Sequence, residues 1–349
     1  MKKVAIGMSG GVDSSVAALL LKEQGYEVIG LFMKNWEESS GACNAAEDYQ
    51  DVIRVCDTLG IPYYTVNFTE EYWSNVFTHF LEELKLGYTP NPDILCNREI
   101  KFKALFQKAM ELGADYLATG HYAQTENGFL LRSADTAKDQ TYFLYTLKKS
   151  ILEKVLFPVG HLKKEEVRAL AHQHGLATAS KKDSTGICFI GERNFREFIN
   201  QYIPYQKGPF KTLEGKIVGE HEGVAFYTIG QRKGLKIGGP GEAWFVVAKD
   251  VSNNTVYIEQ GDDHPALYES HLTASEMTWV TDAPPTLPFR CLAKIRYRQP
   301  DQECVIESIS EGVAKISFPT PQRAVTPRQA IVFYEGSTCL GGALICPKS

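Results

Sequence analysis

Short apolar runs and helical stripes alternate over about the first 115 residues of the chain. An apolar run without polar interruption predicts a strand covered on both faces, whereas apolar residues three or four positions apart predict a helix. The expected elements, in chain order, are KVAIGM, SSVAALLLKEQ, YEVIGLFM, a helix ending at Gly60, IPYYTVNF, a helix over about 70–86, KFKALFQKAMEL and DYLATGHYA. Strands and helices in this order predict a parallel sheet with helices on both faces, a Rossmann-like α/β domain.

The pattern changes twice further along the chain. It stays helical over about 150–203, apart from one irregular loop, SKKDSTGICFIGE. After Pro204 glycines become frequent, and short alternating segments such as TVYIEQG predict strands. The proline-rich TDAPPTLPF precedes a second set of strands, which predicts a barrel-like unit. We therefore expect three domains: an α/β domain with a helical part over 1–205, a small central β domain over 206–272, and a barrel-like β domain over 273–349.

Composition and charge narrow the class of protein. A chain of 349 residues, 44% hydrophobic and 23% charged, can bury several ordinary globular cores. The net charge of −5 gives no general attraction to phosphate backbones, which argues against a non-specific nucleic-acid binder but leaves a specific one open. The sequence shows neither a secretory leader nor an apolar run of about 18 residues. We therefore expect a cytosolic protein that does not enter a membrane.

Eight cysteines are spread along the chain without any Cys-x-x-Cys pair, which argues against a disulfide framework and a zinc ribbon. Two of them differ from the rest by their context. Cys96 lies in PNPDILCN, just before a predicted helix, and Cys188 lies in the irregular DSTGICFIGE. A thiol near a helix N-terminus has a lowered pKa, which increases the nucleophilic thiolate fraction at neutral pH. Both cysteines are therefore candidates for chemistry.

The segment SGGVDSS, residues 9–15, directly follows the first predicted strand and opens a helix. Glycines let several backbone amides converge on one point, so the loop and the helix N-terminus can hold a pyrophosphate group. Asp13 beside a phosphate indicates a divalent cation between them. The lysine and the spacing of a Walker A loop are absent. The segment instead resembles the pyrophosphate loop of the N-type ATP pyrophosphatases, which split ATP between its α and β phosphates and adenylate a substrate oxygen.

An adenylated carbon needs a nucleophile, and the two thiols can supply one. One cysteine would carry sulfur as a persulfide; the other would attack it and close a disulfide, releasing sulfide at the activated carbon, or would assist direct attack. The sulfurs of Cys96 and Cys188 must then approach bonding distance during turnover. Asp93 would act as the general acid or base that handles the N–H proton of the substrate.

Nine motifs are distributed from Lys3 to about Gly342: GMSGGVDSS, FMKNW, TPNPDILCNREIKF, TGHYA, AKDQTYFL, DSTGICFIGERNFREF, YTIGQRKGL, RYRQ and PQRAVTP. Together they resemble those of the bacterial tRNA-specific 2-thiouridylases. Enzymes of this family convert the wobble uridine, position 34 of tRNA, to 2-thiouridine and release AMP and pyrophosphate from ATP. The resemblance implies an adenine nucleotide alpha hydrolase-like N-terminal domain, with the β domains gripping the anticodon arm and the target base flipped out of its stack.

The resemblance also implies roles for particular residues. Cys96 would be the nucleophile, Cys188 the persulfide carrier and Asp93 the acid or base. The implied ATP-binding residues are Gly7, Met8, Ser9, Gly10, Gly11, Val12, Asp13, Ser14, Met33 and Gly120. The implied tRNA contacts are Asn91, Pro92 and Asp93 beside the flipped base, and His121, Lys138, Asp139, Gln140, Arg296, Tyr297 and Gln329. ATP with Mg²⁺ is the implied cofactor, and no protein-held metal site is expected.

The implied partners are tRNA, with lysine, glutamate and glutamine acceptors, and a sulfur-donor protein, either a cysteine desulfurase or a sulfur relay protein. The chain is expected to act as a monomer. One departure is Arg328, where the family usually has glycine: a positive φ would strain arginine, or its cation would meet a phosphate. Three alternatives stay open: an amidating ligase with the same loop, a nucleotide-binding RNA-binding or redox protein, and an iron–sulfur cluster held by Cys96, Cys188 and Asp93.

Overall fold

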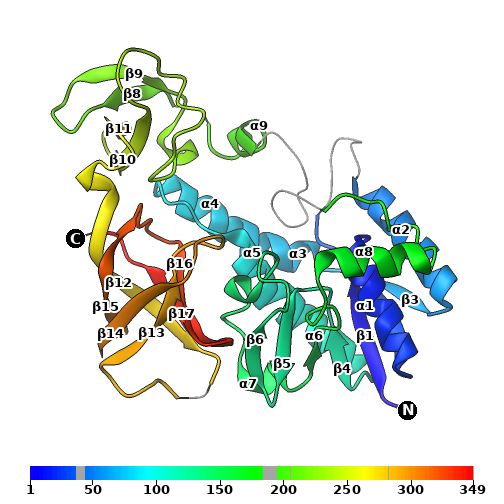
Figure 1. Ribbon diagram of the computed structural model, residues 1–349. Helices are drawn as coiled ribbons and strands as arrows, with labels where there is room; N and C mark the ends of the chain where they lie inside the picture. Colours follow the sequence, from blue (N-terminus) through cyan, green and yellow to red (C-terminus); the bar gives the residue numbers. More distant parts are fainter. Residues whose placement is uncertain (37–43, 184–194, 205, 282, 349) are drawn as a thin grey trace.

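The computed structural model covers residues 1–349 and describes 1–36, 44–183, 195–204, 206–281 and 283–348 (Figure 1). Cys188 lies outside the described residues. In the described part of the chain no helix is both long and apolar enough to cross a membrane.

The first domain is built on a five-stranded parallel sheet in the order β3-β2-β1-β4-β7. Its strands are β1 (Lys3–Met8), β2 (Glu27–Lys34), β3 (Tyr63–Asn67), β4 (Tyr116–Ala118) and β7 (Val155–Leu156). The central strand β1 is buried from Val4 to Met8, because helices cover both faces of the sheet. The parallel sheet predicted from the apolar runs is confirmed.

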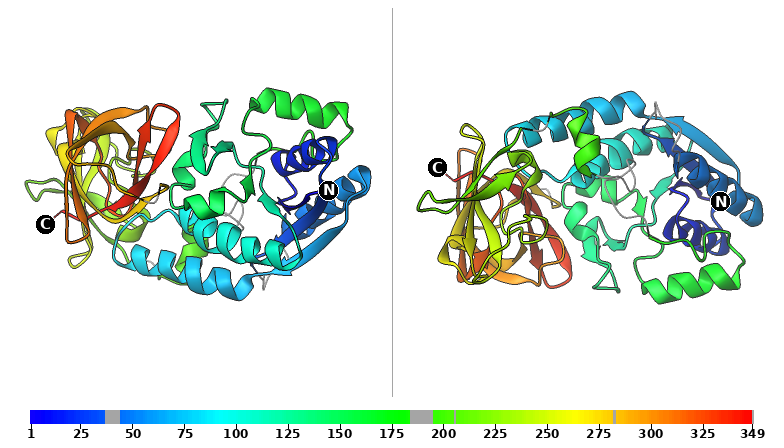
Figure 2. Two further views of the ribbon diagram at one scale, coloured as in Figure 1. Left: turned by 90° about the horizontal axis from the view of Figure 1, so that it is seen from below. Right: turned by 90° about the horizontal axis from the view of Figure 1, so that it is seen from above.

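Helices cover the two faces of this sheet as separate layers (Figures 1 and 2). One layer consists of α1 (Val12–Glu23), α2 (Asn44–Leu59) and α8 (Lys164–Gln173), which share one apolar core. The other layer contains two longer helical rods, made of α3 (Thr69–Tyr72), η1 (Trp73–Phe77) and α4 (Thr78–Lys85), and of α5 (Pro92–Leu95), η2 (Cys96–Leu105) and α6 (Phe106–Glu111). The remaining helices are α7 (Lys149–Leu152), α9 (Phe195–Asn200) and the short turns η3 (Thr141–Phe143), η4 (Val224–Phe226) and η5 (Pro265–Leu267).

Two expectations for the middle of the chain are wrong. The strand expected over DYLATGHYA ends at Ala118, because Gly120 turns away to pack on the backbone of Asp13 and Ser14. The segment over 150–203, expected to be helical, also contributes the edge strand β7, whose two residues are too few to leave a pattern in the sequence. Between them the chain forms an unexpected hairpin, β5 (Ala123–Glu126) and β6 (Phe129–Arg132).

The C-terminal part forms a closed barrel. Its strands are β12 (Tyr268–Trp279), β13 (Phe289–Lys294), β14 (Gln302–Ser310), β15 (Val313–Arg323), β16 (Ala330–Glu335) and β17 (Thr338–Ile345), and pairing of β12 with β17 closes the ring. Closure leaves few exposed strand edges. One further pairing reaches outside: β17 also bonds to β6 of the first domain, with Thr338 opposite Leu131 and Cys339 opposite Leu130. The predicted barrel is confirmed, and it is continuous with the hairpin.

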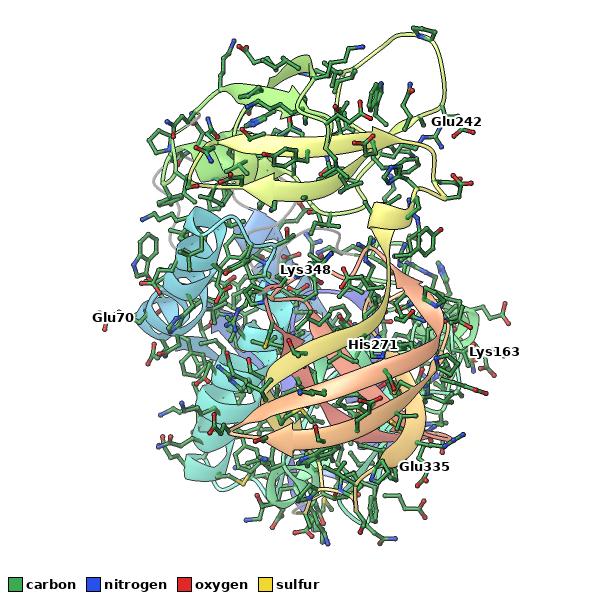
Figure 3. The ribbon with its side chains drawn as sticks, turned by 90° about the vertical axis from the view of Figure 1, so that its left-hand side faces the viewer. Glu70, Lys163, Glu242, His271, Glu335 and Lys348 are labelled. Carbon is green, nitrogen blue, oxygen red and sulfur yellow. The ribbon has the colours of Figure 1, made fainter. Side chains whose placement is uncertain are left out.

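A small central β domain stands above the end of the barrel, and β12 leads from one to the other (Figure 3). Its sheet has the order β10-β11-β8-β9, with β8 (Gly208–Lys211), β9 (Ile217–His221), β10 (Trp244–Asp250) and β11 (Thr255–Gln260). Phe210, Val246 and Ile258 are fully buried in its core. The predicted central β domain is confirmed; the limits drawn between domains stay a prediction, and β12 extends on both sides of the limit at residue 272.

Candidate active site

The glycine loop connects the end of β1 to the start of α1. The Ser9 amide donates to Ser14 Oγ at 3.2 Å, and Ser14 Oγ and Ser15 Oγ donate to the Gly11 carbonyl at 3.1 and 2.8 Å. Gly11 is the N-cap of α1, so no cap side chain covers the amides of the first turn. The loop is thus a rigid, hydroxyl-lined cradle whose amides and helix terminus favour an anion.

Two glycines are required by close contacts around this loop. Gly10 has φ +75°, and a Cβ there would lie 2.6 Å from the Asp48 carbonyl oxygen. A Cβ at Gly120 would lie 2.7 Å from the Ser14 amide nitrogen. Real Cβ atoms do not approach backbone so closely, so a side chain at Gly10 would displace α2 and one at Gly120 would displace α1. Gly120 therefore supports the cradle from behind, whatever else it contacts.

Asp13 is held by a lysine from α8. Lys164 Nζ lies 2.8 Å from both carboxylate oxygens, and Tyr122 donates its hydroxyl to Oδ1 at 2.8 Å. Burial raises the pKa of Tyr122, and the neighbouring Asp13 raises it further, so this hydroxyl stays a donor. The sequence reasoning did not identify Lys164, because 151 positions separate it from Asp13.

The same lysine connects Asp13 to a second carboxylate, Asp183. Lys164 Nζ lies 2.7 Å from Asp183, which also pairs with Lys138 and Arg168 at 2.8 Å. Burial works to raise the pKa of Asp183, but hydrogen bonds from Lys138 and Lys164 prevail and lower it to about 2. Asp183 is therefore ionised at neutral pH, and three cations balance the two carboxylates beside the loop.

Cys96 is not in front of a helix but inside one, which corrects the expectation from sequence. The helix begins at Pro92, with Asn91 as its N-cap accepting from the Asp93 amide at 3.1 Å. Cys96 lies one turn further in, where η2 begins with π-helical geometry. The helix dipole acts mainly within the first turn, so it acts on Asp93 more than on Cys96. Short π-helical stretches occur frequently at functional sites.

Cys96 is fully buried, in the same apolar core as Met33. This core lies on the sheet face opposite α1, so the helix of Cys96 and the end of β2 share one side of the sheet. The thiol therefore reaches a substrate only when neighbouring groups move. Whether its sulfur meets that of Cys188 is not tested, since Cys188 lies outside the described residues.

His121 lies beside this core as a neutral imidazole. Its Nδ1 is 2.8 Å from Thr119 Oγ1 and its Nε2 is 3.4 Å from the Lys101 ammonium, while its ring contacts Phe102 and Phe157. Burial lowers the pKa of His121 well below its usual value, and the Lys101 charge lowers it further. Because lysine can only donate, Nε2 accepts and Nδ1 carries the proton.

The other residues expected to contact tRNA already have partners within the protein. Asp139 is buried and accepts from the Ser133 amide at 2.9 Å, and Gln140 accepts from the Tyr122 amide at 2.8 Å. Arg296 donates to two backbone carbonyls, the ring of Tyr297 packs on Phe143, and Gln329 donates to the Thr89 carbonyl. Their tRNA contacts stay a prediction.

Arg328 does have a positive φ, +65°. Its guanidinium does not point at an empty surface: it pairs with Glu83 of α4 and Glu276 of β12, each at 2.8 Å. The extra cation of this chain therefore joins the first domain to the barrel.

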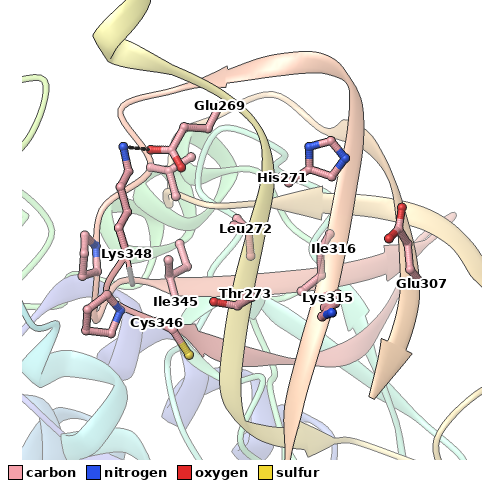
Figure 4. A pocket seen from close by; sticks show the side chains of 13 residues that line it. Glu269, His271, Leu272, Thr273, Glu307, Lys315, Ile316, Ile345, Cys346 and Lys348 are labelled. Atoms are coloured by element: carbon pink, nitrogen blue, oxygen red, sulfur yellow. Dashed lines mark ion pairs between the residues drawn. The ribbon is translucent and has the colours of Figure 1, made fainter. Parts of the chain in front are cut away.

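Two further observations concern ligands. Among the described residues no group of three His, Cys, Asp or Glu side chains is placed to hold a metal ion. A pocket of about 290 Å³ lies on the barrel between β12, β15 and the C-terminal segment, where Lys348 pairs with Glu269 at 2.7 Å (Figure 4). None of the expected site residues lines this pocket.

Comparisons with known proteins cover nearly the whole chain. Three family models match in succession: the tRNA methyl transferase HUP domain over 2–192, the tRNA methyl transferase PRC-barrel domain over 196–260 and the aminomethyltransferase beta-barrel domain over 269–345. A U34-tRNA thiolase, NcsA from Methanococcus maripaludis with its [4Fe-4S] cluster, is 23% identical over 58% of this chain and 67% of that chain, with a TM-score of 0.38. That likeness is too distant to support a functional inference.

Curated relatives are much more similar. The chain is 59% identical to tRNA-specific 2-thiouridylase MnmA of Geobacillus thermodenitrificans (strain NG80-2), over 98% of this chain and 94% of that protein. It is 61% identical to the protein of the same name from Protochlamydia amoebophila (strain UWE25), over 99% and 93%. With this identity over nearly its full length, the chain belongs to the family of tRNA-specific 2-thiouridylases.

Proposed function

We propose that the chain catalyses the ATP-dependent 2-thiolation of the wobble uridine, position 34, of tRNA. The products are 2-thiouridine, AMP and pyrophosphate. The observation that supports this best is the joint arrangement of a hydroxyl-lined glycine loop, with Asp13 and Lys164 beside it, and the helix of Asp93 and Cys96 on the same sheet. Family membership supports the same reaction.

The activation step uses the first domain. The uracil O2 attacks the α-phosphorus of ATP, and pyrophosphate leaves with its charge held by the loop amides, the serine hydroxyls and the N-terminus of α1. Mg²⁺ bound with ATP would neutralise phosphate charge. Asp13 is a chemically suitable ligand for this ion, because it is a carboxylate beside the loop. In the structure Lys164 contacts both of its carboxylate oxygens. Adenylation turns a poor leaving oxygen into AMP, a good leaving group.

The sulfur-transfer step uses the thiols. In one route the Cys188 persulfide attacks C2 and expels AMP; Cys96 then attacks the Cys188 sulfur, which frees the thiocarbonyl and leaves a Cys96–Cys188 disulfide. In the other route Cys96 attacks the persulfide first, and the released sulfide attacks C2. Both routes end in the same disulfide, which an external thiol must reduce. Asp93, in the first turn of its helix, takes the N3 proton of uracil.

The decisive experiment is mass spectrometry of tRNA nucleosides after incubation with ATP, Mg²⁺ and a persulfide source. We expect 2-thiouridine with the wild-type chain and none with Cys96→Ala or Cys188→Ala, while both variants still form AMP or an adenylated tRNA. Cys56→Ala, at a buried thiol of α2 remote from Cys96, is the matched control and should retain activity. Full activity of both variants would favour the amidating-ligase alternative, since ammonia needs no thiol.

The proposal also covers the binding partners of the chain and its location in the cell. The chain acts in the cytoplasm as a monomer, binds tRNAs for lysine, glutamate and glutamine by the anticodon arm, and receives sulfur from a cysteine desulfurase or a sulfur relay protein. Two of the residues proposed to contact tRNA also join domains: Gln329 donates to the Thr89 carbonyl of the first domain, and Arg296 donates to the Ile229 carbonyl of the central part. Anaerobic iron and sulfide analysis separates this mechanism from the cluster alternative, because a persulfide enzyme is active without iron.

A further inference from the structure

Asn35 is a polar residue in an apolar setting. It stands directly after β2, and only 2% of it is exposed. Neither its Oδ1 nor its Nδ2 has a hydrogen-bond partner within the part of the chain that the structure describes. Folded proteins pair nearly all buried amides, because an unpaired one is unfavourable. Folding alone therefore does not explain an asparagine at this position.

The neighbouring strand offers a direct comparison. Asn67 is the residue opposite Lys34 in the pairing of β2 with β3, and it also ends its strand. Its Oδ1 accepts from the Thr69 amide at 3.1 Å and from the Thr69 hydroxyl at 2.7 Å, so it holds the first residue of α3. Asn67 thus has a structural role that Asn35 lacks, although both lie at the same edge of the sheet.

The position of Asn35 indicates which molecule it contacts. β2 runs parallel to β1, with Met8 opposite Phe32, so Asn35 follows β2 at the edge where the glycine loop follows β1. Nucleotides bind in parallel sheets at this carboxyl edge. A nucleotide whose phosphates lie on the loop has its nucleoside end within reach of an adjacent strand, and Met33 is the penultimate residue of β2.

We propose that Asn35 reads the adenine ring of ATP, its amide pairing with the 6-amino group and the adjacent ring nitrogen. This rests on the proposed function. A planar amide offers one donor and one acceptor side by side, which matches that edge of adenine. Uracil also presents a neighbouring N–H and C=O, but the residues expected beside the flipped base, Asn91 and Asp93, stand on another element, α5 and its cap.

The test combines Asn35→Leu with a nucleotide that lacks the 6-amino group, purine riboside triphosphate. Binding is measured by calorimetry without tRNA. For the wild-type chain we expect ATP to bind about tenfold more tightly than the analogue, since one or two hydrogen bonds are lost. Asn35→Leu should bind the two nucleotides equally. Its melting temperature without nucleotide should be unchanged or higher, because leucine removes an unpaired buried amide.

Asn67→Ala is the matched control. We expect it to lower the melting temperature, because the two hydrogen bonds from Thr69 are lost, and to keep the wild-type preference for ATP. The inference would be overturned if the Asn35→Leu protein kept the preference for ATP over the analogue. It would also be overturned if the substitution raised KM for tRNA and left KM for ATP unchanged. If the wild-type chain prefers ATP but forms no 2-thiouridine, the proposed function fails while the role of Asn35 stands.

Discussion

Arg328 illustrates how one residue can combine strain with a useful contact. Its left-handed backbone is unfavourable for any residue with a Cβ, yet its side chain pairs with Glu83 and Glu276 from two different domains. Sequence comparison identified the position as unusual but could not determine the partners, because Glu83 is 245 positions away. The structure bears on both hypotheses for this position. The backbone φ is positive, as the strain hypothesis required, and the additional cation pairs with two carboxylates within the protein.

Two substitutions at this position separate these effects. Arg328→Ala loses the ion pairs and retains the strain, whereas Arg328→Gly loses the ion pairs and relieves the strain. We expect the glycine variant to be more stable than the alanine variant by about 1 kcal/mol, the reverse of their usual order in regular structure. Urea unfolding monitored by tryptophan fluorescence measures this difference in the free energy of unfolding. Equal stability would mean that the turn relaxes in the variants.

His121 predicts a pH dependence of stability. Its pKa is lowered in the folded chain, so below about pH 6.5 the unfolded chain binds more protons than the folded one. Stability should therefore fall as pH drops from about 6.5, with a contribution of up to about 1.4 kcal/mol per pH unit from this residue. His121→Asn should show a shallower slope between pH 6.5 and 5 in urea titrations. An unchanged slope would show that the ring gains access to solvent.

At the scale of elements, α8 supplies what the glycine loop lacks. The loop has no lysine of its own, and Lys164 from the first turn of α8 takes that place beside Asp13. The Lys164 side chain is only 12% exposed and its ammonium bridges two carboxylates, so the interaction is stronger than a solvent-exposed pair. The contact holds α8 against the start of α1.

A double-mutant cycle tests this bridge. Lys164→Met leaves Asp13 and Asp183 without their shared cation, so we expect a loss of about 1–2 kcal/mol in the free energy of unfolding of the first domain. Asp13→Asn combined with Lys164→Met should lose less than the sum of the single changes, with a coupling of at least about 0.5 kcal/mol. Lys163→Met, at the exposed neighbour labelled in Figure 3, should be neutral. Strict additivity would contradict a direct interaction.

How much of the fold and of the candidate site could be predicted depends on whether the sequence signal for a feature is local. The apolar run of β1 and the glycines after it lie within about fifteen positions, and they predicted a buried strand and a loop that opens a helix, both of which the structure has. The anion-binding role of this loop stays a prediction. The start of the Cys96 helix was misplaced: Cys96 was expected just before the helix, although Pro92 suits the first helical position and the helix begins there. Lys164 and Asn35 have no local signal, because burial and distant parts of the folded chain determine their surroundings. The β5–β6 hairpin did have one that was missed: Asn127 and Gly128, both with positive φ, form the two-residue turn typical of hairpins.

At the scale of the whole molecule, the three domains converge on the segment before Asp93. Thr89 accepts from Gln329 of the barrel through its carbonyl, and its hydroxyl lies 3.2 Å from that of Thr228 in the central part. The segment that carries Asn91 and Asp93 is therefore held from two sides. We therefore expect a change at Gln329 or Thr228 to affect the residues proposed to face the flipped base.

The pairing of β6 with β17 has a practical consequence for anyone who dissects this chain. A fragment that stops at residue 205 would retain the hairpin but lose the strand that covers it, so Leu130 and Leu131 would present bare amides and carbonyls to other molecules. Such an edge invites self-association. We therefore expect the catalytic half to aggregate when it is expressed alone, and we expect co-expression with the separate barrel to keep it in solution.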